Sequence, residues 1–301
     1  YYHGNACGFT VNDVDPGWKA TGAVLATAKA EWYRQACRAA GARVLFGTMA
    51  AGAVTEGDAL KGVVVVLPDG QRGVIRARTV VDATGNADLA AAAGEETAFI
   101  SAEEPAVQGA GLARHIMGAS YNNSDVAFVD TTDAGDPFFL ARRAYASMPD
   151  NTWDAGQNPA SRERRRLTGV VTVTPMDILN GRTWPDMIVR PSSDFDSHGF
   201  TVHDLFFVYD IGKTAFTANL PYRALLPKRL DGLLVTGLGI SAHRDAVPLL
   251  RMQRDVQNQG YAAGYASALA VQAQVPVRGV DMAALQAHLV AKGIIGAAHT
   301  N

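Results

Sequence analysis

Cysteine is scarce in this chain of 301 residues, which contains only Cys7 and Cys37. Two cysteines are too few for a disulfide framework or a structural zinc site. Positive charge is not in excess either, since 27 Lys and Arg stand against 29 Asp and Glu, a formal net charge of −2. A strongly basic surface is therefore excluded, and nucleic acid is not an expected ligand.

Long hydrophobic runs are absent as well. A membrane-spanning helix needs about 20 apolar residues, whereas the longest β-like run covers residues 63–67. The opening residues, YYHGNACGFTVND, have neither the positive charge nor the apolar stretch of a signal peptide. Because the sequence does not begin with Met, we expect it to start inside a longer protein.

Hydrophobic periodicity predicts several elements with little ambiguity. Apolar positions at helical spacing predict an amphipathic helix over residues 21–40, and the β-branched runs on either side of Pro68-Asp69-Gly70 predict a hairpin over residues 60–77. Two helices are expected near the end of the sequence, over residues 251–274 and 281–293.

A turn of the kind that meets phosphates follows the hairpin. In RARTVVDATGNADLAAAAG, residues 76–94, an apolar run ends at Asp82-Ala83-Thr84-Gly85 and an Ala-rich helix follows. A strand that leads through Gly into a helix usually presents backbone N–H groups to a phosphate. No G-x-G-x-x-G stretch accompanies it in the sequence, and Asp82 could instead cap the turn.

A second Gly-rich turn lies far along the chain. In LDGLLVTGLGIS, residues 230–241, an apolar strand runs into Gly237 and Gly239, and a long helix follows. A lone Gly-x-Gly is weak evidence of a ligand, and it gains weight only from the strand before it and the helix after it.

Together the two stretches resemble one family, the FAD-dependent oxidoreductases with a glutathione-reductase-like flavoprotein fold. VVDATGNADLAAAAG resembles the strand that approaches FAD, and residues 220–264 resemble the C-terminal flavin-binding segment. The hairpin matches a small β-meander of that family, and YYHGNACGFT also has a counterpart there. The resemblance implies an α/β fold: a partial glutathione-reductase-like FAD-binding fold with a β-meander and an inserted α+β substrate region.

The resemblance also implies a division of the chain and a partner. Residues 1–95 and 226–301 would form parts of the FAD-binding domain, and residues 96–225 a substrate or cap region. The family's N-terminal βαβ unit, which holds the ADP half of FAD, has no counterpart in the sequence. We therefore expect a dinucleotide-binding fragment or subunit on a separate chain, produced by proteolytic processing or encoded separately, in a heterodimer without a nucleic-acid or membrane partner.

Three groups of residues would hold the cofactor according to the resemblance. The first lies beside the adenosine and pyrophosphate, the second beside the ribityl chain and phosphates, and the third at the pyrimidine end of the isoalloxazine. In that order they are Ala83, Thr84 and Gly85; Gly237, Gly239 and Ile240; and Arg251, Met252 and Gln253.

His243 and Arg251 are the candidate catalytic residues. His243 could act as a base beside the carbon that donates hydride, or could hydrogen-bond locally. Arg251 could stabilise negative charge on the flavin, or could be an ordinary salt-bridged Arg. Arg244 and Asp245 could anchor a polar substrate, but they are expected to pair with each other. His3 and Cys7 could attach FAD covalently, whereas an unreactive buried Cys is the simpler interpretation.

Two polar runs are expected to be structural. DFDSHGFTVHD, residues 194–204, fits no zinc or calcium spacing and predicts a solvated loop, so no metal is expected. SRERRR, residues 161–166, could bind an acidic substrate, or could be a solvated helix face or pair with acids in a partner chain.

The sequence thus predicts an FAD-dependent oxidoreductase, an oxidase or dehydrogenase that moves a hydride from a small polar substrate to flavin. Two alternatives belong to other classes: a non-catalytic scaffold subunit of a flavoprotein complex, and a flavin-dependent isomerase or lyase. A scaffold would keep full turnover after substitution of His243 or Arg251, and an isomerase or lyase would need no electron acceptor.

Overall fold

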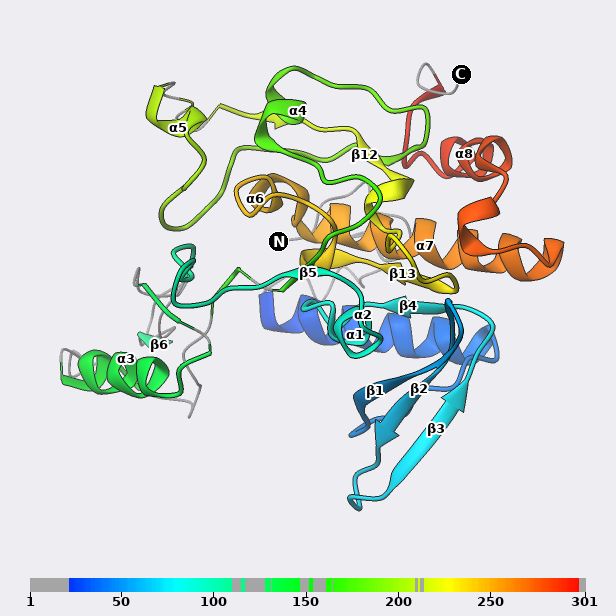
Figure 1. The fold of residues 1–301 in the computed structure, drawn as a ribbon, viewed down its shortest axis with the longest axis horizontal. Coiled ribbons are helices and arrows are strands. Elements are labelled where there is room, and N and C mark those ends of the chain that lie inside the picture. Colours follow the sequence, from blue (N-terminus) through cyan, green and yellow to red (C-terminus); the bar gives the residue numbers. More distant parts are fainter. Residues whose placement is uncertain are drawn as a thin grey trace.

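The computed structural model describes residues 22–109, 115–116, 128–130, 132–146, 152–153, 161–163, 165–208, 211 and 214–297. Its elements mix helices with small sheets, as an α/β fold requires. Figure 1 shows strands β4 (Val80–Asp82) and β13 (Leu233–Val235) at the centre, between a three-stranded meander on one side and the C-terminal helices on the other.

The meander confirms the hairpin predicted from the β-branched runs. Strands β1 (Met49–Glu56), β2 (Ala59–Val66) and β3 (Arg72–Arg76) pair antiparallel in that order. The turn between β2 and β3 closes where the Gln71 N–H donates to Asp69 Oδ1 at 3.0 Å. Gly70 adopts φ +82°, which glycine reaches without steric cost.

β4 and β13 form a parallel pair, with Val80 opposite Leu233 and Asp82 opposite Val235. Helix α2 (Asp88–Ala92) follows β4, while a 3₁₀ turn at Gly237–Gly239 and helices α6 (Val247–Leu250) and α7 (Gln253–Ala273) follow β13. Because parallel strands point the same way, the segments after both strands leave from one edge of the sheet.

The region between these strands in sequence is built from short pieces, as its irregular composition predicts. Helices α3 (Gly135–Ala146), α4 (Pro175–Leu179) and α5 (Leu205–Val208) alternate with two-residue and three-residue strands. The strand pairs are β5 (Thr97–Ala98) with β8 (Arg166–Leu167), β6 (His115–Ile116) with β7 (Thr152–Trp153), β9 (Met187–Val189) with β12 (Leu220–Pro221), and β10 (Ser192–Ser193) with β11 (Phe216–Thr217).

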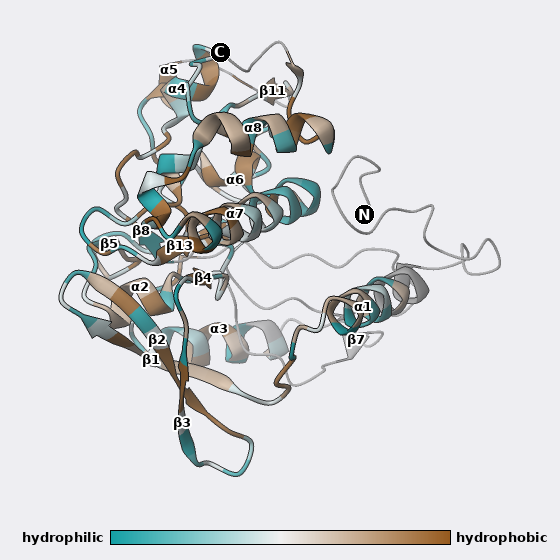
Figure 2. Ribbon diagram, turned by 90° about the vertical axis from the view of Figure 1, so that its right-hand side faces the viewer, coloured by the Kyte–Doolittle hydropathy of each residue, from teal (hydrophilic) through white to brown (hydrophobic). Residues whose placement is uncertain are grey.

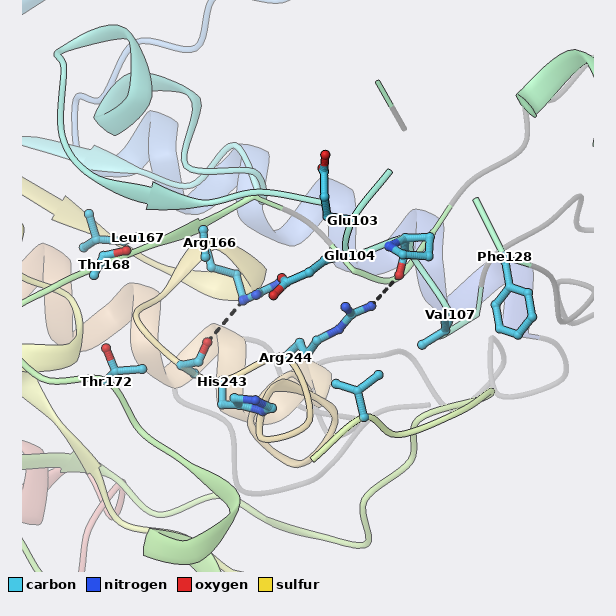
Figure 3. A pocket seen from close by; sticks show the side chains of 14 residues that line it. Glu103, Glu104, Val107, Phe128, Arg166, Leu167, Thr168, Thr172, His243 and Arg244 are labelled. Carbon is cyan, nitrogen blue, oxygen red and sulfur yellow. Dashed lines mark hydrogen bonds between the residues drawn. The ribbon is translucent and has the colours of Figure 1, made fainter. Parts of the chain in front are cut away.

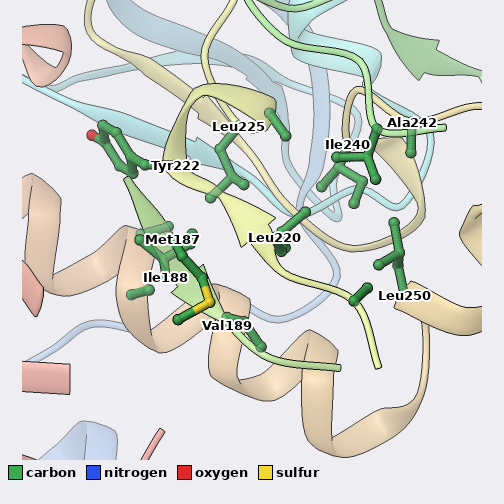
Figure 4. Packing of buried hydrophobic residues seen from close by; sticks show 14 of the residues in the cluster. Met187, Ile188, Val189, Leu220, Tyr222, Leu225, Ile240, Ala242 and Leu250 are labelled. Carbon is green, nitrogen blue, oxygen red and sulfur yellow. The ribbon is translucent and has the colours of Figure 1, made fainter. Parts of the chain in front are cut away.

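The main hydrophobic core crosses the expected boundary at residue 225. Figure 4 shows Met187, Ile188 and Val189 of β9 packed beside Leu220 of β12, with Ile240 close by. Helices α7 and α8 (Met282–Ala291) contribute further buried residues to the same cluster. The cap segment and the C-terminal segment therefore share one core, and the division into three regions stays a prediction.

The predicted N-terminal helix is confirmed as α1 (Gly22–Ala39), and α7 and α8 confirm the two expected near the end. Figure 2 shows α1 apart from α7 and α8. The segment after it is apolar and exposed: Phe46 and Met49 have 74% and 69% of their surface accessible. None of the described helices is both long and apolar enough to cross a membrane.

Truncation of β13 in the core tests this architecture. Leu234 is fully buried in the main cluster, so Leu234→Ala is expected to lower the free energy of unfolding by about 2–5 kcal/mol. Val74→Ala on the exposed side of β3 is the control, because Val74 is 55% accessible and its change should be small. Equal urea midpoints for the two variants would contradict the burial of β13.

Candidate functional site

The two Gly-rich turns meet at the carboxyl edge of β4 and β13. The turn after β4 and the 3₁₀ turn after β13 touch where Gly239 faces Ala87. A Cβ on Gly239 would lie 2.8 Å from the Ala87 backbone nitrogen, which real Cβ atoms do not tolerate, so only glycine fits at this contact. The structure therefore brings together two motifs that the sequence places far apart.

A cavity of about 480 Å³ opens beside these turns. Its wall combines the turns with side chains of α1 and with the first turn of α7. Five of the predicted cofactor residues line it, namely Ala83, Gly85, Gly237, Arg251 and Gln253. Its other lining residues, which sequence reasoning missed, are Lys29, Tyr33, Thr236, Leu238, Val256 and Gln257.

Gly85 and Gly237 present their backbones in the left-handed region, both at φ +74°. A Cβ on Gly85 would meet no atom within 4 Å, so the backbone there borders open space. The Gly237 N–H already donates to Oε1 of the buried Gln259 at 3.0 Å. Gly85 thus offers close access to the cavity, whereas Gly237 is fixed by a partner inside the protein.

Asp82 organises the turn after β4. Its buried carboxylate accepts the Thr84 N–H and hydroxyl at 3.0 and 2.7 Å, and the N–H groups of Leu89 and Ala90 at 2.9 and 3.2 Å. The N–H groups at the start of α2 are therefore satisfied internally. The expectation that this helix presents them to a phosphate is wrong, and the capping role of Asp82 is confirmed.

The sequence predicts that Arg251 either lies at the cofactor or is an ordinary salt-bridged arginine, and the structure is consistent with both. It lines the cavity just before α7, and its Nη2 donates to the backbone oxygen of Asp196 and lies 3.4 Å from Asp196 Oδ2. Met252 is the N-cap of α7 and provides no side-chain cap. Arg251 and the N-terminal end of α7 therefore border the same cavity.

Thr84, Gly239, Ile240 and Met252 are predicted cofactor residues that do not line this cavity. Thr84 is held by Asp82, Gly239 packs on Ala87, and Ile240 is buried in the main core. His3 and Cys7 lie outside the described residues.

A second cavity, of about 810 Å³, contains His243 (Figure 3). Residues 166–172 and 242–244 form one side of it. These two segments are joined where the His243 N–H donates to the Val173 carbonyl at 2.8 Å and the Val173 N–H to the Ser241 carbonyl at 3.1 Å. The position of His243 is therefore fixed by backbone pairing with the cap region.

His243 is arranged as a hydrogen-bond donor. Its Nδ1 accepts the Asp245 N–H at 3.1 Å, so in the neutral ring the proton resides on Nε2. Burial lowers the pKa of His243, the nearby His203, Arg166 and Arg244 act in the same direction, and Asp245 opposes them. This geometry favours donation from Nε2 over the predicted role of base.

Arg244 and Asp245 do not pair with each other, contrary to expectation. The Arg244 guanidinium bonds to Glu163 Oε1 and to the Pro105 carbonyl. The Asp245 carboxylate accepts Gln108 Nε2 at 2.6 Å and two backbone N–H groups of residues 202–203. Both charges are buried, and each finds its partners in a segment distant in sequence.

The Arg-rich run is not a solvated helix face. Arg166 lies in β8 and is buried, and Arg165 pairs with Asp88 at 3.1 Å. The polar run 194–204 is also less solvated than expected, because Asp196 pairs with His198 at 2.6 Å and with Arg251. Among the described residues, no group of His, Cys, Asp or Glu is arranged to hold a metal ion.

A family model for the FAD dependent oxidoreductases matches residues 11–109 and 139–289, well over half of the chain. The chain belongs to this family. No curated protein and no solved structure matches it. Membership in the family makes the protein a flavin oxidoreductase and FAD its cofactor, and so confirms the resemblance at the level of family and cofactor.

The residues around the smaller cavity fit the cofactor of this family. FAD is an anionic molecule through its pyrophosphate, and the cavity offers Lys29, Arg251 and the N-terminal end of α7. The open backbone at Gly85 admits a close-lying group. Lys29 and Tyr33 are four residues apart on the predicted helix, and this spacing is the sequence signal that could have identified them.

Removal of the Asp82 carboxylate tests the turn. Asp82→Ala leaves the buried N–H groups of Leu89 and Ala90 without partners, so the free energy of unfolding should fall by about 3 kcal/mol in urea titrations. Asp69→Ala is the control, because Asp69 is exposed and accepts the Gln71 N–H in a surface turn. A stability loss no larger than that of the control would contradict the capping role.

The pH dependence of stability tests the state of His243. Since its folded pKa is below the ordinary value of 6.5, the unfolded chain takes up the proton more readily. Stability is therefore complete above about pH 6.5 and decreases as the pH falls toward the folded pKa. His243→Asn keeps an acceptor for the Asp245 N–H and does not titrate, so it should lose less stability between about pH 7.5 and 5.5.

The measurement is urea unfolding of both proteins at the two pH values. Burial also lowers the pKa of His198. Because His198 is present in the variant and in the parent protein, it does not contribute to the difference between them. Identical losses in the variant and the parent protein would show that His243 is not held neutral.

Proposed function

We propose that this protein binds FAD at the cavity beside β4 and β13 and transfers a hydride from a small polar substrate to the flavin. The observation that carries the proposal is the meeting of the two Gly-rich turns with Arg251 and the start of α7 around one cavity. FAD supplies the hydride acceptor when it is bound. The protein supplies position, charge and access.

Each part of the cavity wall has a distinct role in this proposal. The backbone at Ala83 and Gly85 lies beside the adenosine and pyrophosphate side, where Gly85 allows close approach. Asp196 holds Arg251 in place. Arg251 and the N-terminal end of α7 favour negative charge on the part of the cofactor that lies next to them. Thr84 supports the turn, and Gly237, Gly239 and Ile240 set the shape of the opposite turn.

In this proposal His243 contacts the substrate and not the cofactor. Its Nε2–H is suited to a hydrogen bond that positions a substrate oxygen. The larger cavity around it has the volume of a small-molecule site.

We also propose a dinucleotide-binding unit on a separate chain, left by processing or encoded separately, as the partner. Its docking surface would include α1 and the exposed apolar segment of Val44, Leu45, Phe46 and Met49. Exposed apolar side chains gathered along one segment are typical of an interaction surface. Lys29 and Tyr33 of α1 also face the cavity, so a unit docked there would border the cofactor.

The decisive experiment is an absorption spectrum of the natively purified protein together with denaturing mass spectrometry of every chain present. Flavin bands with a second, smaller chain carrying a G-x-G-x-x-G segment are the expected result. A mass increment on this chain would show covalent attachment of FAD, for which His3 and Cys7 are the candidates. A colourless single chain in an active preparation would overturn the proposal in favour of the scaffold, and turnover without an electron acceptor would indicate an isomerase or lyase.

A matched pair of glycine variants tests the location of the cofactor. Gly85 and Gly57 both have positive φ and open space where a Cβ would go, but only Gly85 borders the cavity. Gly85→Ala should lower the flavin content of the purified protein, while Gly57→Ala, with similar backbone strain, should not. Equal flavin content in the two variants would place the cofactor elsewhere.

A further inference from the structure

The surface that lines the larger cavity is mostly apolar, although half of the residues that line it are polar or charged. Its apolar lining includes Val107, Phe128, Leu167 and Val202, and its polar side is formed by Arg166, His243 and Arg244. A mostly apolar surface with polar groups at defined positions is the usual design of a site for an organic molecule.

Two buried carboxylates hold these walls in place. Glu163 accepts the N–H groups of Val107 and Gln108 and bonds to Arg244. Asp245 accepts the N–H groups of residues 202 and 203 and the side chain of Gln108. Three segments distant in sequence are thereby fixed around the cavity, and Arg244 is committed to this framework through Glu163 rather than to a ligand.

Arg166 and His243 are donors at the cavity wall, together with the hydroxyls of Thr168 and Thr172. Arg166 is buried, and its Nε donates to the Ala242 carbonyl at 3.2 Å, which orients the guanidinium. Burial lowers the pKa of Arg166, and the positive charge of Arg244 lowers it further. The carboxylates of Glu163, Glu104 and Asp245 raise it. Burial and the neighbouring Arg244 thus disfavour the charge of Arg166, and the three carboxylates favour it.

Glu104 shows which kind of group these donors accept. Figure 3 shows its carboxylate directed toward the Arg166 guanidinium, while the Glu103 side chain points away. Glu103 is exposed, and its carboxylate accepts the Ser101 hydroxyl at 2.7 Å. Because Glu104 is also exposed and lies on a loop, moving its carboxylate aside requires no core rearrangement.

We infer that the larger cavity binds an organic carboxylate with an apolar body, whose carboxylate takes the position of Glu104 beside Arg166, with His243 as a further donor at the same cavity. The inference rests on the proposed function in that it names the class of substrate. The apolar wall receives the body of the molecule, and the two donors fix the carboxylate end.

Binding of 2-naphthoate, compared with the uncharged 2-naphthamide, tests the inference directly. Naphthalene fluorescence or calorimetry on the natively purified protein gives both dissociation constants without any turnover. A charge-assisted hydrogen bond to a buried Arg predicts that the acid binds about tenfold more tightly than the amide, or better. Equal affinities would overturn the inference.

Three variants locate the binding. Arg166→Met should weaken naphthoate binding about tenfold or more, and Arg182→Ala, which removes an exposed arginine beside Trp184, should leave it unchanged. Glu104→Gln should tighten naphthoate binding several-fold, because it removes the competing carboxylate. If Glu104→Gln and Arg166→Met both bind naphthoate like the parent protein, the carboxylate lies elsewhere and the inference is wrong.

Thermal unfolding shows whether each variant is folded. If Arg166→Met does not fold, Arg166→Lys and Glu104→Gln decide the question, since neither removes the positive charge from the cavity wall. This test is separate from the test of the proposed function. Tighter binding of the acid by a protein without flavin would support this inference alone. Flavin bands together with equal affinities for acid and amide would support only the flavin proposal.

Discussion

The parallel pairing of β4 with β13 is the constraint on which the rest of the structure depends. Three residue pairs, from Val80 with Leu233 to Asp82 with Val235, set the register. A shift by one residue would turn the side chains of one strand to the opposite face and displace the two turns relative to each other. The contact of Gly239 with Ala87, the cavity beside Gly85 and the place of the α7 N-terminus all follow from this register.

Buried carboxylates recur wherever the fold must hold an irregular backbone. Asp82, Glu163 and Asp245 are all nearly inaccessible to solvent, and each accepts several backbone N–H groups. A buried charge is costly unless such partners satisfy it. The energetic consequence is that these loops are rigid without regular secondary structure, which suits walls that must hold functional groups in fixed positions.

In the proposed function, the two cavities divide the chemistry of a flavin oxidoreductase between them. The smaller one gathers open backbone and positive charge beside the parallel strands, and the larger one gathers apolar surface with Arg166 and His243. The segment from Gly237 to Arg244 contributes to both. A short stretch of chain thus links cofactor and substrate in the proposed function, and small changes in its conformation would affect both sites.

The sequence by itself determined the elements whose signal is local: α1, α7, α8 and the β2–β3 hairpin follow from the spacing of apolar residues and from Pro68-Asp69-Gly70. It also identified the family, and it named five residues of the smaller cavity, because strand, glycine and helix occur there in a fixed order. Only the tertiary structure decided which partners the charges take. The backbone N–H of His243 pairs with the Val173 carbonyl, Arg244 bonds to Glu163 rather than Asp245, and Arg166 is buried in a strand. These arrangements join segments that are distant along the chain, and local patterns carry no information about such contacts.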